Sequence, residues 1–288
     1  MLKVKKMSDC TFSEIHRVWN EAFSNYSLNF QITVDQLSSM IGKKDLLPSC
    51  SFIAFDGDRP VGFVFNAVKV INGVKMAWNG GTGVSPDYQG RGIGKLIMEA
   101  TMDIYQKELV EMATLEVITD NIHAVSLYER WGYETVHTSV SFSIDGKGNE
   151  INGEEYILTK GTVLDVKSLD FYNHQVAWES MCENIFNGSS MIIANQAGTP
   201  LGYALYKPYI GTNRQENIIL FQLETNPTLS IEDQDMAFHR LVDCVFKRGV
   251  SGRTGDFISA NDRAFTMLYE RGFQRIASRY IMYKRMYG

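Results

Sequence analysis

The sequence predicts an α+β (mixed α/β) protein built from two tandem copies of one fold, each with a central, mostly antiparallel sheet flanked by helices. The first observation is an internal repeat. Ser49–Val64 resembles Ser189–Ala204, and Asn121–Tyr133 resembles Asn261–Phe273, with the same offset of 140 residues (189 − 49 and 261 − 121). Two blocks in one register are typical of a duplicated unit. The second observation is the order of elements in the first copy, which mixes helices with a strand meander.

The two copies are expected to meet in a polar, glycine-rich segment, Ser143–Glu155. Such a composition is typical of linkers and exposed turns. We therefore predict one domain over residues 1–145 and a second over residues 146–288.

Two helices are predicted at the start of the first copy. Ser13–Tyr26 carries apolar residues at helical spacing, and Thr33 is a suitable N-cap for a second helix that includes Leu37 and Met40. These helices precede the predicted strands, so they are available to cover one face of a sheet.

A three-stranded meander follows. Phe52–Phe55 and Pro60–Val70 are apolar runs separated by a turn. Asn72-Gly73 predicts a hairpin because both residues accept positive φ, and Val74–Val84 is the third strand. The first copy then continues with a helix from Ile93, a strand over Ala113–Ile118, a short helix from Asn121 to Gly132 and a strand from Tyr133.

The composition limits the classes of function. The chain has 288 residues, 44% hydrophobic and 21% charged, with a formal net charge of −5, so a globular protein is expected and a nucleic-acid partner is not. The four cysteines are scattered without a CxxC pair, which indicates no metal site. No apolar run approaches ~18 residues, and the charged N-terminal segment is unlike a signal peptide, so we expect no membrane partner and a cytoplasmic location.

The segment after the third strand predicts an anion site. Glycines allow the backbone to approach a pyrophosphate, and the first N–H groups of the following helix lack internal partners. An arginine and a lysine can add positive charge. The residues of this segment are Gln89, Gly90, Arg91, Gly92, Ile93, Gly94 and Lys95.

Two other phosphate-binding patterns do not fit this segment. The Walker sequence GxxxxGK[ST] is absent. A Rossmann loop requires a βαβ unit, whereas a strand meander precedes this loop.

At this point the sequence resembles the GNAT acetyltransferases. Gln89 to Gly94 fits that family's loop, [Gln/Arg]-x-x-Gly-x-[Gly/Ala]. The later family pattern, Asn-x-x-Ala-x-x-Leu-Tyr-x-x-x-Gly-Phe, is matched from Asn121 to Gly132, with Tyr133 in place of the final phenylalanine. The resemblance covers residues 1–142 and implies two tandem GNAT-like domains.

The resemblance implies acetyl-CoA as co-substrate and assigns roles to particular residues. The backbone of Gly83 and Val84 would pair with the pantetheine arm, and the loop from Gln89 to Lys95 would hold the pyrophosphate. Asn121 would contact the CoA arm. Tyr128 would lie near the sulfur and protonate the departing thiolate.

Glu116 is the candidate general base. It lies in Leu115-Glu116-Val117, which resembles the strand of the ribosomal-protein alanine acetyltransferases that places a glutamate near the acceptor amine. The alternative is a surface carboxylate on a half-exposed strand. Ile118 stands where that pattern often has arginine, which weakens the case for a protein N-terminus as substrate.

The segment Trp78 to Thr82 has two interpretations. Trp78, Asn79 and Thr82 could line the acceptor pocket, with the two polar side chains holding a water. Alternatively, the two glycines between them form a bulge, and Trp78 belongs to the core.

The second copy lacks the anion loop. With the repeat offset, Gln89–Lys95 maps onto Leu229–Asp235, which has no glycine and three acidic residues. Tyr128 maps onto Leu268, and the neighbouring Tyr269 would point elsewhere because one helical residue turns by about 100°. We therefore predict no acetyl-CoA site in the second domain.

These observations predict an N-acetyltransferase that uses acetyl-CoA to acetylate a primary amine, with a small molecule as acceptor. The alternatives are a peptide or protein amine as acceptor, or a CoA-binding sensor without turnover. The duplicated architecture suggests a monomer that acts as a pseudo-dimer of two domains, or a weak homodimer.

Overall fold

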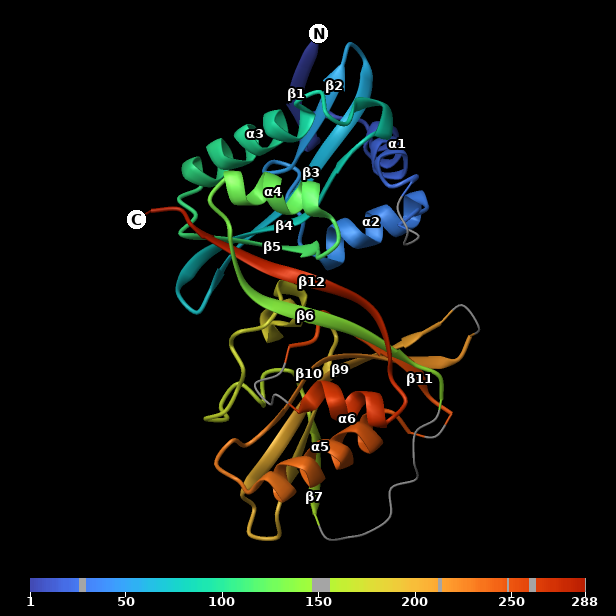
Figure 1. The fold of residues 1–288 in the computed structure, drawn as a ribbon, viewed down its shortest axis with the longest axis vertical. Helices are drawn as coiled ribbons and strands as arrows, with labels where there is room; N and C mark the ends of the chain where they lie inside the picture. The colour runs from blue at the N-terminus through green and yellow to red at the C-terminus, as the bar shows by residue number, and fades with distance from the viewer. Residues whose placement is uncertain (26–29, 147–155, 212–213, 248, 259–262, 288) are drawn as a thin grey trace. The chain divides into compact units, whose positions relative to one another are not determined.

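We describe the chain from a computed structural model, drawn in Figure 1. The structure describes residues 1–25, 30–146, 156–211, 214–247, 249–258 and 263–287. Three parts of the sequence predictions lie outside these ranges, namely Tyr26, Asn261 and residues 147–155 of the proposed linker.

The chain forms two compact units. The first consists of Met1–Val136 together with Tyr280–Gly288, and the second of His137–Arg279. The division therefore differs from the boundary expected at 145/146, because two strands continue from one unit into the other. Strand β6 (Glu134–Ile144) begins in the first unit, whereas β12 (Gln274–Arg285) ends in it.

The sheet of the first unit has the predicted mostly antiparallel character. Its strands β1 to β4 pair in sequence order and antiparallel, whereas β4 and β5 are parallel. The end of β12 lies next to β5. Asn72 and Gly73 have φ values of 51° and 82°, as the hairpin prediction requires. The sequence analysis missed β1; the five strands are β1 (Leu2–Lys6), β2 (Phe52–Asp56), β3 (Arg59–Ile71), β4 (Val74–Val84) and β5 (Met112–Ile118).

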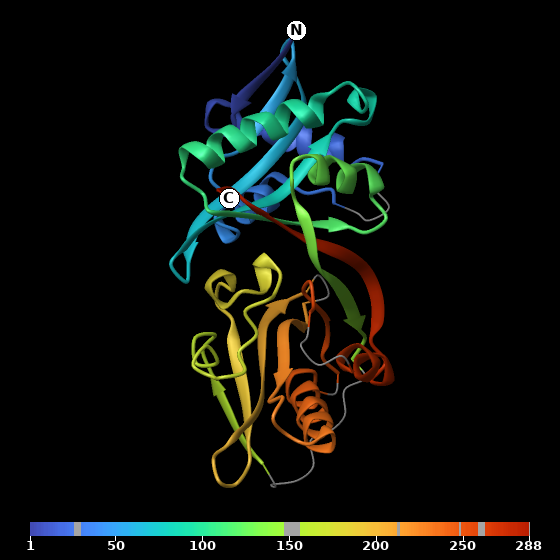
Figure 2. The same cartoon turned by 60° about the vertical axis from the view of Figure 1, so that its left-hand side comes forward.

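Helices cover both faces of this sheet. Thr11 and Thr33 each cap a helix through a capping box, which confirms the N-cap expected at Thr33. On one face the ring of Trp19 stacks on Phe63 at 5.1 Å. On the other, α3 and α4 pack in one core (Figures 1 and 2). The helices are α1 (Phe12–Ala22), α2 (Val34–Lys43), α3 (Ile93–Lys107) and α4 (Ile122–Arg130).

The second unit repeats the sheet but not all the helices. Strands β7 to β10 are antiparallel, β10 and β11 are parallel, and β11 pairs antiparallel with β6. Gly132 and Gly272, one offset apart, both follow a helix with φ near 80° (79° and 85°). Its elements are β7 (Ile157–Gly161), β8 (Ser189–Ala194), β9 (Pro200–Ile210), β10 (Glu216–Thr225), α5 (Ile231–Val245), β11 (Ser251–Thr254) and α6 (Ala264–Glu270).

Residues 162–188 of the second unit differ from the first. Where α1 and α2 would stand, this segment has only two short 3-10 turns, Trp178–Ser180 and Cys182–Asn184. The predicted fold class, a mixed α/β tandem, is nevertheless confirmed, because both units keep the sheet order and the two later helices.

Two further findings concern the expectations that were drawn from the composition. None of the helices in the described ranges is long and apolar enough to cross a membrane. The four cysteines are free; Cys50, Cys182 and Cys244 are buried and Cys10 is partly exposed.

The core of the first unit depends on the end of β12. Met282 is fully buried there, among side chains of α3, α4 and β5. We expect Met282→Ala to lower the free energy of unfolding by about 2–5 kcal/mol, since it leaves a cavity. Ile276→Ala is the control, because Ile276 lies on the same strand and is 44% exposed; its cost should stay below about 1 kcal/mol. Equal losses in urea unfolding would show that Met282 is not part of this core.

Candidate functional site

The candidate site begins where two parallel strands part. The β4–β5 pairing runs from Met76 opposite Met112 to Asn79 opposite Leu115 and goes no further in the described register. Strand β4 continues to Val84 against β3 alone. One edge of the backbone at Gly83 and Val84 therefore has no strand beside it. Such an edge presents N–H and C=O groups to an extended ligand.

The strand segment before this edge contains a bulge. The register between β3 and β4 shifts at Gly80, where an added Cβ would lie 2.5 Å from the Trp78 ring. Asn79 donates to the Thr82 hydroxyl at 2.9 Å, and that hydroxyl donates back to Asn79 Oδ1 at 3.0 Å. Asn79 Oδ1 also accepts from the Gly81 N–H at 3.1 Å. These two polar side chains thus bond to each other and to the bulge.

The glycine loop follows β4 directly. A 3-10 turn, Pro86–Tyr88, leads to Gln89, whose Nε2 donates to the Val84 carbonyl at 3.3 Å. Gly90 and Gly92 adopt positive φ (74° and 81°), and no atom lies within 4 Å of where their Cβ would be. Their role is therefore backbone conformation, which other residues adopt at a cost.

The start of α3 suits an anion. Its N-cap is Gly92, so no side chain caps the helix, and the first turn carries no acidic residue. The first-turn N–H groups lack partners within the helix and carry the positive end of its dipole. Ile93 is buried and Gly94 faces Leu127, so both anchor the loop to the core.

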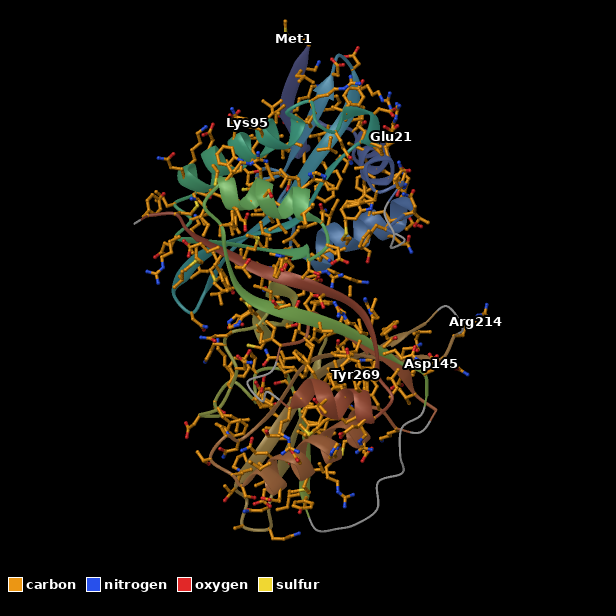
Figure 3. All side chains as sticks on the ribbon, viewed as in Figure 1. Met1, Glu21, Lys95, Asp145, Arg214 and Tyr269 are labelled. Atoms are coloured by element: carbon orange, nitrogen blue, oxygen red, sulfur yellow. The ribbon has the colours of Figure 1, made fainter. Side chains whose placement is uncertain are left out.

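Two cationic side chains lie beside this helix start. The Arg91 guanidinium lies over the Tyr88 ring, 5.0 Å from its centroid. Lys95 is on the first turn of α3, 3.7 Å from Glu99, and its side chain is 73% exposed (Figure 3). An open glycine backbone, an uncapped helix start and exposed cations together fit a pyrophosphate group.

The equivalent helix of the second unit has the opposite character. Ser230 caps α5 by accepting from the Asp233 N–H at 3.1 Å. Glu232 and Asp233 place negative charge in its first turn. The donors that an anion would need are thus partly used, and the local charge repels it.

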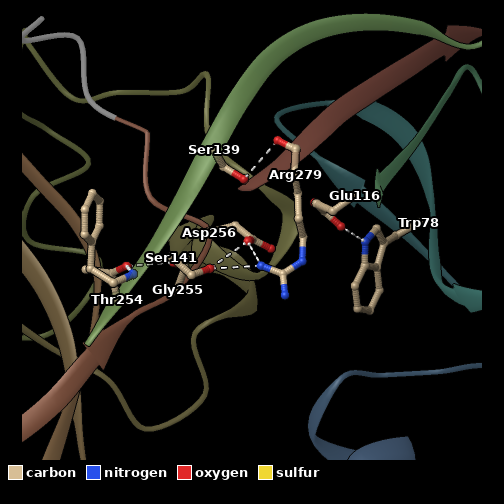
Figure 4. A network of polar contacts seen from close by, with 9 residues as sticks. Trp78, Glu116, Ser139, Ser141, Thr254, Gly255, Asp256 and Arg279 are labelled. Carbon is tan, nitrogen blue, oxygen red and sulfur yellow. Dashed lines mark hydrogen bonds and ion pairs between the residues drawn. The ribbon is translucent and has the colours of Figure 1, made fainter. Parts of the chain in front are cut away.

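Glu116 lies on β5 beyond the last β4–β5 pair. The indole N–H of Trp78 donates to its Oε2 at 2.6 Å (Figure 4). Trp78 is 3% exposed, so this donor is fixed by the packing of its ring. The structure agrees with the interpretation of Trp78 as a core residue beside a bulge, whereas its lining of an acceptor pocket stays a prediction.

The matching carboxylate of the second unit has a different partner. Asp256 lies 140 residues after Glu116 (256 − 116) and forms an ion pair with Arg279. Its Oδ1 also accepts from the Ser141 hydroxyl at 3.2 Å (Figure 4). The equivalent carboxylates of the two units therefore have different hydrogen-bond partners.

Tyr128 and Asn121 are both on α4. Asn121 Oδ1 accepts from the Ala124 N–H at 3.2 Å and so caps the helix. Tyr128 is 6% exposed and its ring lies 6.0 Å from that of Tyr133. Burial raises the pKa of Tyr133 well above the usual range. At the repeat offset from Tyr128, Leu268 is fully buried, while the neighbouring Tyr269 is 50% exposed (Figure 3).

Tyr128 and Glu116 approach β5 from opposite faces. Leu115 and Val117 pack in the same core as Tyr128, and alternate residues of a strand point to opposite faces. Glu116 therefore points to the face away from α4. In this structure the two candidate groups therefore lie on opposite faces of β5.

Sequence analysis missed one residue near Glu116. Tyr283, on β12, belongs to the first unit. Nothing in the first copy indicates it, because it is separated from Glu116 by the whole second copy.

Comparison with known proteins identifies a family for part of the first unit. Residues 13–133 match the model of the acetyltransferase (GNAT) family. The first unit contains a GNAT acetyltransferase domain. The matched residues include β2 to β5 and the glycine loop, that is, every part of the candidate site except Tyr283.

Curated relatives resemble this GNAT domain. A mycothiol acetyltransferase of Streptomyces scabiei is 29% identical over 122 residues, 42% of this chain and 39% of that protein. The [ribosomal protein bS18]-alanine N-acetyltransferase of Escherichia coli is 34% identical over 70 residues, 24% of this chain and 47% of that protein. Each match spans less than half of the relative.

A solved structure extends the likeness to the whole chain. A tandem GNAT protein from the clavulanic acid biosynthesis pathway covers 100% of this chain and 99% of its own, with a TM-score of 0.62 and 12% identity. At that identity the likeness concerns the fold alone. It agrees with the presence of GNAT-like folds in both units.

The conformation of the glycine loop can be tested by stability. Gly92→Ala should lower the free energy of unfolding by about 1–2 kcal/mol, because alanine is strained at positive φ. Gly42→Ala is the matched control, since its Cβ also meets open space but its backbone is helical; it should stabilise by about 0.5–1 kcal/mol. Chemical denaturation measures both, and a neutral Gly92→Ala would contradict the left-handed cap.

Proposed function

We propose that the first unit is an N-acetyltransferase that transfers the acetyl group of acetyl-CoA to a primary amine of a small molecule. One observation carries the proposal. The uncapped, glycine-bounded start of α3 lies directly after the end of β4, where β4 and β5 part. An extended ligand with a pyrophosphate at one end fits such a combination of open strand edge and anion cradle.

The residues present would hold acetyl-CoA along this path. The backbone of Gly83 and Val84 would pair with the pantetheine arm, and the loop from Gln89 to Lys95 would receive the pyrophosphate. Asn121 would border the CoA arm while it caps the helix that carries Tyr128. Acetyl-CoA supplies the activated acyl group, so the protein needs to supply position and proton transfer.

Two side chains of the chain would move protons. Glu116 accepts the proton that the substrate ammonium must lose before its nitrogen can attack. As the C–N bond forms and the C–S bond breaks, the Tyr128 hydroxyl donates its proton to the departing sulfur. The attacking nitrogen loses its second proton as it becomes an amide, and this proton restores the Tyr128 hydroxyl, directly or through solvent. Glu116 releases its proton to solvent, so both groups end as they began and one proton is set free.

The acceptor is proposed to be a small molecule on two grounds. Ile118 takes the place of the arginine that is frequent in acetyltransferases of protein N-termini. The half-buried carboxylate of Glu116 attracts a compact ammonium group. The relatives' names include both mycothiol and a ribosomal protein, so a screen should contain small-molecule amines and peptide amines.

Calorimetric titration tests the cofactor. Acetyl-CoA should bind at one site per chain, and Gly92→Glu should abolish binding, because it adds strain and negative charge at the cradle. Glu232→Gln, at the equivalent helix of the second unit, should leave binding unchanged. Two sites per chain, or none in the unmodified protein, would contradict this part of the proposal.

Amine acetylation assays test the proton-transfer roles. Glu116→Gln and Tyr128→Phe should each lower kcat by about 10²–10⁴-fold with little change in acetyl-CoA affinity. His123→Ala is the control, because His123 is exposed on the first turn of α4. A Tyr128→Phe variant that bound acetyl-CoA and kept the full rate would remove Tyr128 from the mechanism.

A further inference from the structure

We propose that Tyr283, on the strand that the end of the chain contributes to the first unit, is a positioning residue for the base Glu116. The inference rests on the proposed function for the identity of the base. It adds that the catalytic geometry of the GNAT domain, residues 13–133, includes a side chain from outside that domain.

The pairing of β12 with β5 places Tyr283. The Met286 N–H donates to the Glu111 carbonyl at 3.0 Å, and the Tyr287 hydroxyl donates to the Gln106 carbonyl at 3.1 Å. The end of β12 therefore lies beside the start of β5, and the two strands run antiparallel (Figure 1). Counting back from Met286 and forward from Glu111 brings Tyr283 opposite Thr114.

This register forms a row across three strands. Trp78 on β4 is opposite Thr114 on β5, and Thr114 is opposite Tyr283 on β12. Glu116 lies two residues beyond Thr114 on the same face of β5, because side chains alternate along a strand. Diagonal neighbours at this spacing are within reach of aromatic side chains. Glu116 is thus flanked by Trp78 on one side and Tyr283 on the other.

The electrostatics of Tyr283 agree with this position. Burial, and then the negative charge of Glu116, raise the pKa of the Tyr283 hydroxyl. The phenol therefore keeps its proton, and a neutral, half-buried ring stands beside the carboxylate. Such a ring excludes water from one side of Glu116 without adding a charge that would compete with the substrate ammonium.

The two flanking rings have different effects. The Trp78 N–H fixes Oε2 of the carboxylate through the 2.6 Å hydrogen bond. Tyr283 limits rotation and hydration of the carboxylate from the opposite side. Carboxylates that lose such a wall become better hydrated and hold their proton less readily.

The repeat shows why the pair of Glu116 and Tyr283 has no counterpart in the second unit. The residue 140 positions before Tyr283 is Ser143, on β6, which pairs with Arg253 of the second unit. A serine cannot form the same wall. The arrangement around Glu116 therefore depends on which of the two equivalent strands reaches the first unit.

The test uses four variants of the full chain: Tyr283→Ala, Tyr283→Phe, Glu116→Gln and Tyr287→Phe. Carboxyl ¹³C NMR of glutamate-labelled protein without acetyl-CoA gives the first readout, and Glu116→Gln assigns the resonance. We expect Tyr283→Ala to shift the Glu116 titration midpoint to lower pH, whereas Tyr283→Phe and Tyr287→Phe leave it in place. Tyr287→Phe is the control for removal of a hydroxyl, because Tyr287 lies just beyond the end of the same strand and is 52% exposed.

Acetylation kinetics give the second readout. Tyr283→Ala should lower kcat by about 10–100-fold, move the acid limb of the pH–rate profile to lower pH and leave the KM for acetyl-CoA unchanged. Tyr283→Phe should restore the rate to within about twofold, since it keeps the ring.

The outcomes separate this inference from the proposed function. An unmodified protein that acetylates no amine defeats the proposed function, while the NMR titration still decides whether Tyr283 borders Glu116. Active protein whose Tyr283→Ala variant keeps the wild-type midpoint and pH profile overturns the inference. A lower melting temperature in that variant without a shift in either midpoint also overturns it, because the role would then be structural.

Discussion

The end of the parallel pairing between β4 and β5 is the constraint on which the rest of the site depends. If the ladder continued past Asn79 and Leu115, the backbone of Gly83 and Val84 would be occupied by strand hydrogen bonds. The bulge at Gly80 accompanies this parting, and the Asn79–Thr82 hydrogen bonds stabilise it. Because β4 then ends at the glycine loop, an open strand edge and an open helix start follow one another within a few residues.

The two units share the strand geometry but differ at the positions equivalent to the candidate site. Strands β10 and β11 also stop pairing early, at Leu220 and Thr254, so the second unit retains the parting of the strands. There, however, the residue after the bulge is Gln222, fully buried and bonded to the Tyr203 hydroxyl at 2.8 Å. In the first unit the bulge carries glycines packed against Trp78 and Phe63. The start of α5 is acidic and capped by Ser230, and Asp256 pairs with Arg279, so the absence of an acetyl-CoA site from the second unit stays a prediction.

Local features were predictable from the sequence because each depends on residues close together in the chain. The cap at Thr33, the turn at Asn72-Gly73 and the left-handed glycines of the loop follow from conformational preferences that act within a few residues. The duplication was visible because both copies keep their glycine and apolar positions. Together, the local preferences and the repeat predicted the fold class and most residues of the candidate site.

The sequence could not predict in the same way that β12 joins β5 of the first unit while β6 pairs with β11 of the second. The two strands are equivalent members of a repeat, and each has the pattern required to complete either sheet. Which sheet each one joins depends on contacts between distant parts of the chain. Tyr283 was missed for this reason. The mutual hydrogen bonds of Asn79 and Thr82 were also not foreseen, because a polar side chain in a strand does not reveal its partner.

The contribution of β12 to the first unit also has a consequence for synthesis of the protein. Residues 1–136 leave the ribosome long before Tyr280–Gly288 exist, so the first unit cannot complete its sheet while the second is still being translated. Completion of its core, which includes Met282, is therefore expected to follow synthesis of the second unit, although most residues of the first unit are made before it.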